Sequence, residues 1–284
     1  MLEIKAPAKV NLFLEVGEKD NSLHKIFSLI DLITLYDYIY IKPSNKTEIR
    51  FISEWEIPED NTITKLILLL KEKFKFEVEI TIKKNIPPAS GLGGGSSNCA
   101  SVLIFLNKIF GFNLKTEEMI EIAKKVGSDV PLFLFGKRCI IRNYGEVVEV
   151  CDDFKLFYLL LVPNLPVSTK QVYDRLDKIS EYGSLTDCYE KVRILIEKIK
   201  CGDIEGAKKI MFNRLEKPCF DLNKTIKEVR DEVEKITGEK FFLSGSGGTL
   251  FAVFKEKEKV SKVNSKIFLE NWRKFEVESL NFGL

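Results

Sequence analysis

Histidine and closely spaced cysteines are scarce in this sequence. The chain has 284 residues with one histidine, His24, and none of its six cysteines forms a C-x-x-C pair. A structural zinc site needs about four Cys or His ligands at short spacing. The sequence therefore disfavours a zinc protein and predicts free thiols in a reducing compartment.

Long apolar runs and a charge excess are also missing. No stretch approaches the roughly 20 apolar residues of a membrane span, and the first residues, M-L-E-I-K-A-P-A-K, have no apolar signal core. Basic and acidic residues number 44 and 42, a net charge of +2. This balance gives no general attraction to nucleic acid or membranes. We expect a cytoplasmic protein whose partner is a small molecule.

Glycine is concentrated in one segment, residues 85–100, which reads N-I-P-P-A-S-G-L-G-G-G-S-S-N-C-A. It follows an alternating strand pattern over residues 77–83 and leads into an apolar helix. Closely spaced glycines cost conformational entropy, which makes sense if a ligand must approach the backbone. Successive N–H groups at a helix N-terminus form an anion site, so the segment predicts a phosphate-binding loop. A flexible turn is the alternative.

Two familiar nucleotide-binding loops do not match this segment. A P-loop has Lys before its Ser or Thr, whereas Gly95 precedes Ser96 here. A dinucleotide-binding loop has a third glycine three residues after the second, and Ser96 stands there.

Three further segments combine turn residues with polar side chains. P-A-K-V-N at residues 7–11 enters a strand, and S-G-S-G-G-T at residues 244–249 lies between two strand patterns. The latter is either a hairpin or a second approach to the same ligand. In G-S-D-V-P-L-F-L, residues 127–134, Asp129 either caps a helix or takes part in catalysis.

The pattern of strands and helices predicts an α/β (α+β) protein of two domains. We place the boundary after residue 152, giving domains 1–152 and 153–284, with a helix-rich segment over 189–237. Near the start, a turn is expected at Pro7 between two strands. Tyr36 and Asp37 are expected to separate two further strands.

In their order and spacing, P-A-K-V-N, P-P-x-S-G-L-G-G-G-S-S and S-G-S-G-G-T resemble the three motifs of the GHMP kinase superfamily, which includes galactokinase, homoserine kinase and mevalonate kinase. Further segments, such as A-K-V-N-L-F-L and F-S-L-I-D-L after His24, resemble the branch that acts on 4-diphosphocytidyl-2-C-methyl-D-erythritol. The resemblance implies an N-terminal α/β domain, a C-terminal ferredoxin-like domain and an active site in the cleft between them. It also implies a monomer or weak homodimer.

The resemblance implies ATP and Mg²⁺ as cofactors and phosphorylation of the 2-hydroxyl of that acceptor, in non-mevalonate isoprenoid synthesis. Asp129 would be the catalytic base, Lys9 its electrostatic partner and Ser97 a metal ligand. The nucleotide would be bound by Asn61, Thr62, Lys65, Pro87, Pro88, Ala89, Ser90, Gly91, Leu92, Gly93, Gly94, Gly95, Ser96 and Ser97. The acceptor would be bound by Asn11, His24, Thr169, Tyr173, Gly245 and Gly247, with His24 bonding cytosine and Tyr173 stacking on it.

The sequence departs from this branch in one turn. Where the branch has D-G-Y-H, with a Tyr that stacks on cytosine, this chain has Asn21-Ser22-Leu23-His24. Leu23 is apolar but lacks a π face, which is expected to cost up to about 1 kcal/mol of base affinity. Another GHMP kinase, for homoserine or mevalonate, and a non-catalytic nucleotide- or RNA-binding protein are the alternative hypotheses.

Overall fold

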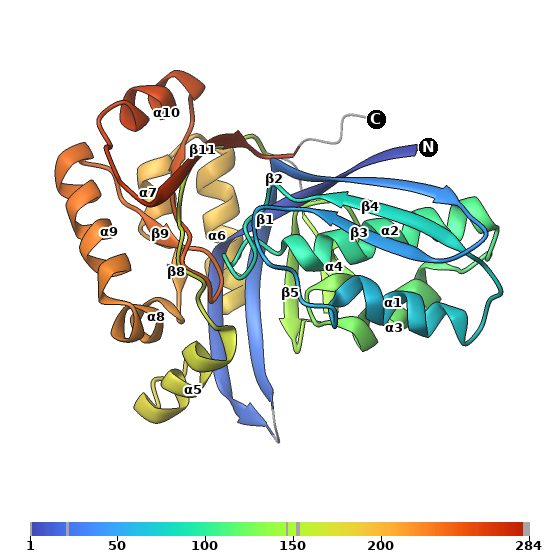
Figure 1. Cartoon of the computed structure of the whole chain (residues 1–284). Coiled ribbons are helices and arrows are strands. Elements are labelled where there is room, and N and C mark those ends of the chain that lie inside the picture. Colours follow the sequence, from blue (N-terminus) through green and yellow to red (C-terminus); the bar gives the residue numbers. More distant parts are fainter. Residues whose placement is uncertain (1, 21–22, 146, 152–153, 281–284) are drawn as a thin grey trace. The chain divides into compact units, whose positions relative to one another are not determined.

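The structure, a computed structural model, describes residues 2–20, 23–145, 147–151 and 154–280. The chain forms two compact units (Figure 1). The first unit comprises Met1–Ala8, Leu35–Pro88 and Gly93–Gly136, and the second comprises Lys9–Thr34, Ala89–Leu92 and Lys137–Leu284. The long strands β1 (Leu2–Asp20) and β2 (Leu23–Pro43) therefore contribute residues to both units. The predicted boundary at residues 152 and 153 lies outside the described residues.

A small sheet forms the base of the first unit. Strand β4 (Val78–Lys83) pairs antiparallel with the end of β2 and parallel with β3 (Glu48–Ile52). Alternate β-branched residues of these strands, such as Ile39, Ile41, Ile80 and Ile82, are buried. This period-2 pattern covers one face of the sheet with apolar side chains, against which helices can pack.

Four helices complete the first unit and lie together on one side of these strands (Figure 1). They are α1 (Thr62–Lys71), α2 (Gly94–Phe110), α3 (Thr116–Val126) and α4 (Val130–Leu134). Helix α2 packs against the other three helices. Its Val102, Leu103 and Leu106 are fully buried, which explains its dense apolar composition.

The second unit contains strands of two sheets. In the first sheet, β5 (Cys139–Asn143) pairs with the start of β2 and with β6 (Val147–Val150), and the short strand β8 (Phe212–Asn213) pairs with β1. The second sheet has the order β11–β7–β10–β9, all antiparallel. Its strands are β7 (Phe157–Pro163), β9 (Phe242–Leu243), β10 (Leu250–Phe254) and β11 (Trp272–Glu278).

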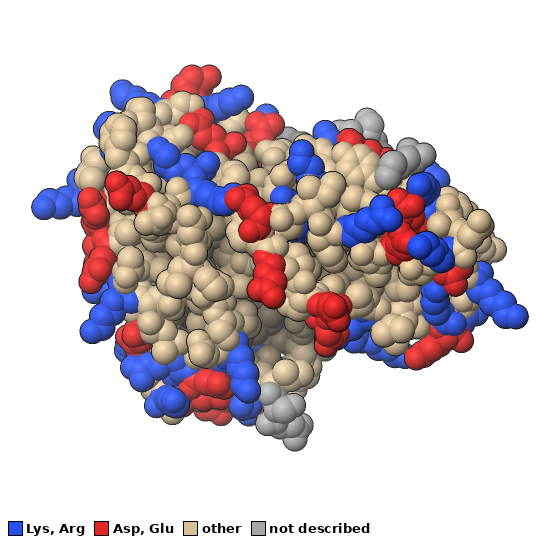
Figure 2. Space-filling model, in the orientation of Figure 1, with Lys and Arg blue, Asp and Glu red and all other residues tan. Residues whose placement is uncertain are grey.

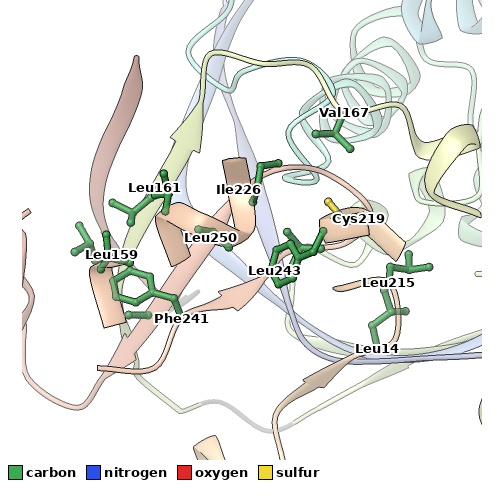
Figure 3. Packing of buried hydrophobic residues seen from close by; sticks show 14 of the residues in the cluster. Leu14, Leu159, Leu161, Val167, Leu215, Cys219, Ile226, Phe241, Leu243 and Leu250 are labelled. Carbon is green, nitrogen blue, oxygen red and sulfur yellow. The ribbon is translucent and has the colours of Figure 1, made fainter. Parts of the chain in front are cut away.

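Helices α5 (Thr169–Ile179), α8 (Glu216–Leu222), α9 (Lys224–Thr237) and α10 (Lys257–Asn264) contribute to the core of this unit. Their apolar residues join Leu159, Leu161, Leu243 and Leu250 of the second sheet in one buried cluster (Figure 3). Helices α6 (Cys188–Lys200) and α7 (Ile204–Lys208) pack against each other. The helix-rich segment that the sequence predicted is thereby confirmed.

A buried polar network ties the second unit together. Arg138 Nη2 lies 2.8 Å from Asp31 Oδ1, and both side chains are almost fully buried. Ser279 Oγ donates to Asp31 Oδ2 at 2.7 Å, and the hydroxyl of Tyr158 donates to the same oxygen. Burial and the neighbouring Asp31 carboxylate hold the pKa of Tyr158 well above its usual value. The network thus connects β2, β7 and the chain after β11.

Two sequence predictions about the first strands are wrong. No turn occurs at Pro7, because β1 runs through it, and no break occurs at Tyr36 and Asp37, because β2 continues to Pro43. The fixed φ of proline is compatible with extended backbone, so Pro7 does not end the strand. Asp37 stays in its strand because its buried carboxylate accepts hydrogen bonds from residues 85 and 86.

The six cysteines are free thiols, as expected. None of the helices in the described part of the chain is long and apolar enough to span a membrane. On the face seen in Figure 2, acidic and basic side chains of the described residues are interspersed.

Candidate active site

The glycine segment turns sharply before α2. Ala89, Gly91 and Gly93 have positive φ values of 52°, 84° and 72°. Gly93 is the N-cap of α2, and no side chain caps this helix end. The first N–H groups of an uncapped helix have no intrahelical partners and lie at the positive end of its dipole. The start of α2 therefore has the geometry of a phosphate site.

Ser97, in the first turns of α2, carries an unsatisfied hydroxyl. The residue is fully buried, and its Oγ has no hydrogen-bond partner among the described residues. Leaving such a group unpaired costs about 1–3 kcal/mol, which a bound ligand or cation would recover. The described residues include no group of three His, Cys, Asp or Glu side chains that could hold a metal ion. The unsatisfied Ser97 hydroxyl is the group that fits one ligand of a bound cation.

The start of α1 lies against the glycine segment. Thr62 Oγ1 donates to the carbonyl of Gly95 at 2.9 Å. Asn61 caps α1, with Oδ1 accepting from the amides of Ile63 and Thr64. Asn61 therefore has a structural role as the N-cap of α1. Lys65 is exposed, with Nζ 3.7 Å from Asp60 Oδ1.

Asp129 stands immediately before α4 as its N-cap residue, but its side chain makes no capping hydrogen bond. Pro131 and Val130 begin the helix. The structure records no hydrogen bond or ion pair between the Asp129 carboxylate and any other described residue. A half-buried carboxylate without a structural partner is available to accept a proton from a bound ligand.

In the second unit, Lys9 and Asn11 begin a buried chain of hydrogen bonds. Lys9 Nζ donates to Asn11 Oδ1 at 2.6 Å, and Asn11 Nδ2 donates to Ser28 Oγ at 2.9 Å. Ser28 Oγ in turn donates to the carbonyl of Phe13 at 2.6 Å. Both Lys9 and Asn11 are about 95% buried. The Lys9 ammonium is thus held in one orientation inside the protein and does not face solvent.

The segment S-G-S-G-G-T, residues 244–249, packs directly on Lys9 and Asn11 and on the first half of the glycine segment. A Cβ added to Gly245 would lie 3.1 Å from Lys9 Nζ and 3.4 Å from Asn11 Oδ1. Ser244 Oγ donates to the carbonyl of Gly91 at 3.1 Å, and a Cβ on Gly247 would lie only 2.1 Å from the Gly91 nitrogen. Only glycine permits such backbone contact. S-G-S-G-G-T therefore does more than connect two strands, because it also packs on the glycine segment.

His24 lies among aromatic rings. Its ring centroid is 5.3 Å from that of Tyr173 and 5.6 Å from that of Tyr182. Nδ1 is 3.0 Å from the carbonyl of Gly17, and Nε2 is 2.9 Å from Asp177 Oδ1. The latter contact lacks the alignment of a hydrogen bond. Nearby, Thr169 Oγ1 and Ser246 Oγ are 2.8 Å apart.

Comparison with known proteins assigns the chain to a family. Residues 61–137 match the family model described as the GHMP kinases N terminal domain, and residues 195–274 match the GHMP kinases C terminal model. Relatives 36% identical in Clostridioides difficile and 33% identical in Clostridium perfringens cover 90% and 89% of this chain and 88% of their own lengths. The chain belongs to the GHMP kinase family. Both relatives are named 4-diphosphocytidyl-2-C-methyl-D-erythritol kinase.

Solved structures agree with this GHMP kinase assignment. A crystal structure of 4-(cytidine 5'-diphospho)-2C-methyl-D-erythritol kinase is 25% identical, with a TM-score of 0.79 over 99% of this chain and 100% of that one. Homoserine kinase from Cytophaga hutchinsonii, 19% identical, has the same fold, with a TM-score of 0.73 over 98% of this chain and 94% of that one. The fold predicted from the motifs is confirmed, and the protein is a small-molecule kinase. The GHMP kinases use ATP as the phosphate donor.

Sequence reasoning missed several residues of this GHMP kinase that the structure places beside predicted ones. Ser28 holds Asn11, while Asp177 and Tyr182 contact His24. Ser28 lies in the segment F-S-L-I-D-L, whose only signal in the sequence is its resemblance to the family. Asp177 and Tyr182 carried no signal, because an Asp on a polar helix face and a Tyr after a helix are common surface features.

Proposed function

We propose that this GHMP kinase transfers the γ-phosphate of ATP to the 2-hydroxyl of 4-diphosphocytidyl-2-C-methyl-D-erythritol. The products are the 2-phosphate and ADP, in the non-mevalonate route to isoprenoid precursors. The observation that carries the choice of acceptor is the His24–Tyr173 aromatic pair, with ring centroids 5.3 Å apart. A homoserine or mevalonate site needs no aromatic platform for a base. The names of the relatives support the same acceptor.

The proposed donor site is the glycine segment with the uncapped start of α2. The segment Gly91–Ser97 binds the phosphates, mainly through backbone N–H groups that precede Ser97, because the Ser97 N–H donates to the Gly93 carbonyl. Pro87–Ser90 continue the contact along the nucleotide. Thr62, bonded to the Gly95 carbonyl, holds the loop against α1. Since the Asn61 side chain already caps α1, we propose that Asn61, Thr62 and Lys65 border the base through the start of this helix.

Phosphoryl transfer needs positioning and charge neutralisation more than covalent assistance. We propose that Asp129 accepts the proton of the attacking hydroxyl, because its carboxylate is not used by the fold. Lys9, oriented by Asn11 and Ser28, lowers the pKa of that hydroxyl. The unsatisfied Ser97 hydroxyl would hold Mg²⁺, which supplies positive charge to the β- and γ-phosphates.

On the acceptor side, Gly245 provides backbone close to Lys9 and Asn11, and Gly247 packs on Gly91. Thr169 bonds the same segment through Ser246. Tyr173 offers a ring for stacking on cytosine. Both nitrogens of His24 already face protein acceptors, so a bond from its ring to cytosine must replace one of these contacts. Leu23 is 58% exposed and provides only an apolar surface.

The test is release of ADP from ATP and Mg²⁺ with 4-diphosphocytidyl-2-C-methyl-D-erythritol, measured beside homoserine and mevalonate. We expect turnover only with the cytidine compound. Turnover with another acceptor would retain the kinase and reject the proposed substrate. Absence of turnover with all three, together with nucleotide binding, would favour a non-catalytic protein.

Asp129→Asn tests the proposed base. We expect it to lower kcat by about 10²–10⁴-fold, the usual contribution of general base catalysis, while ATP still binds. Asp187→Asn is a matched control, because Asp187 is also an N-cap Asp without a capping bond, before α6, and is exposed. Equal activity of the two variants would show that Asp129 is not the base.

A further inference from the structure

A buried ion pair lies where β4 leads into the glycine segment. Lys84 follows β4 directly, and its Nζ contacts Asp37 Oδ2. The side chains are 5% and 0% exposed, and both residues belong to the first unit. Neither residue is among those that the motifs assigned to the site.

Asp37 binds three consecutive residues at the start of the loop. Besides the Lys84 ammonium, Oδ1 accepts hydrogen bonds from the amides of Asn85 at 2.7 Å and Ile86 at 2.8 Å. Asn85 Nδ2 also donates to the carbonyl of Tyr36 at 3.0 Å. The chain leaving β4 is therefore held by the neighbouring strand and has little conformational freedom.

The same residues contact the start of α2. A Cβ added to Gly94 would lie 2.9 Å from Ile86 Cγ2 and 3.2 Å from Lys84 Nζ. Gly94 is the first residue of α2, so the ammonium lies beside the first helical turn. Any larger residue at position 94 would displace either the pair or the helix.

The positive charge of Lys84 at the start of α2 does not stabilise this helix. A cation near a helix N-terminus opposes the helix dipole by about 0.3–1 kcal/mol, and burying an ion pair seldom stabilises a fold more than apolar residues would. The same cation at the same place attracts an anion bound to the N–H groups of that turn. The unsatisfied Ser97 hydroxyl in these turns independently indicates a ligand there.

We propose that Lys84 and Asp37 are positioning residues for the polyphosphate of the nucleotide. Asp37 fixes the path from β4 into the loop, and Lys84 raises the positive potential at the start of α2. The inference rests on the proposed function only in taking the bound anion to be a nucleotide phosphate. The experiment that tests this inference measures only nucleotide binding. A protein that failed to phosphorylate the proposed acceptor would therefore not contradict the inference.

The experiment compares the binding of ADP and adenosine by titration calorimetry. We expect Lys84→Met to weaken ADP binding about tenfold, to change adenosine binding less than about twofold, and to reduce the salt dependence of ADP binding. Lys84→Arg should retain most of the affinity for ADP. Lys83→Met, at the exposed neighbouring position, is the matched control and should have no effect.

Lys84→Met alone leaves the buried Asp37 carboxylate without its counter-charge and can fail to fold. The double variant Asp37→Asn/Lys84→Met avoids this problem, because it leaves no unpaired charge buried. Its melting temperature shows whether it is folded. Its affinity for ADP should fall, although less than in Lys84→Met, where the unpaired Asp37 carboxylate also repels the phosphates. Equal losses for ADP and adenosine, or an unchanged salt dependence of ADP binding, would overturn the proposal and assign the pair a purely structural role.

Discussion

Nε2 of His24 lies 2.9 Å from Oδ1 of Asp177, across 153 residues of sequence. The same carboxylate accepts hydrogen bonds from Lys19 Nζ and the Tyr182 hydroxyl, each at 3.1 Å. Asp177 therefore connects β1, β2, α5 and the segment after α5. It fixes the ring that the proposed function places beside cytosine.

Asp177→Asn is expected to raise KM for the cytidine substrate about fivefold, which corresponds to about 1 kcal/mol for one weakened polar contact. KM for ATP should not change, because Lys19, His24 and Tyr182, which contact this carboxylate, do not belong to the proposed nucleotide site. Steady-state kinetics with each substrate varied in turn measure both constants. Asp174→Asn, an exposed position on the same helix, is the control. A parallel rise in both KM values would indicate general loosening instead.

The same carboxylate predicts a pH dependence of stability. Burial alone would raise the pKa of Asp177, but hydrogen bonds from Lys19 and Tyr182 and the charge of His24 outweigh it, so the pKa lies below the usual 3.8. A carboxylate with a lowered pKa stabilises the fold above its unfolded-state pKa, and this contribution disappears as the pH falls through the folded-state pKa. The Tm difference between the parent and Asp177→Asn should shrink between pH 5 and pH 3. A difference that grows toward low pH would contradict the assignment.

Gly91→Ala should disrupt the contact between the two glycine segments. Gly91 has a φ of 84°, and a Cβ there would lie 2.1 Å from the Ser244 carbonyl oxygen. We expect a loss of stability well above the ~1 kcal/mol that positive φ alone costs, and loss of activity. Gly238→Ala isolates that strain, because its φ is 72° and the added Cβ meets no atom within 4 Å. Urea unfolding of both variants should give clearly different losses; similar values would refute the close contact.

Arg138→Met should destabilise the second unit strongly. It leaves the Asp31 carboxylate buried without its counter-charge, which typically costs about 3–5 kcal/mol. Arg193→Met removes an exposed arginine that pairs with Glu190 and Glu197, and should change the stability far less than Arg138→Met. Chemical denaturation gives both free energies. A small effect at Arg138 would mean that water or Tyr158 compensates the carboxylate.

Local sequence was sufficient where neighbouring residues decide the structure. The alternating pattern over residues 77–83 predicted β4, and the glycines of residues 91–95 indicated the turn before α2. Local sequence was insufficient at Pro7, because the pairing of β1 overrides the tendency of proline to mark a turn. The roles of Lys9 and Asp129 stay predictions that rest on the family resemblance.

The sequence by itself determined the family and the segments to which the proposed function assigns the chemistry, because closely spaced glycines, a buried-strand pattern and the order of three motifs can be read from the sequence. Only the tertiary structure decided which distant residues support them. Asp37 at the loop, Ser28 behind Asn11 and Asp177 beside His24 are ordinary polar residues in sequence. They acquire their roles because strand pairing and helix packing bring them into buried surroundings, where a polar group must find a partner.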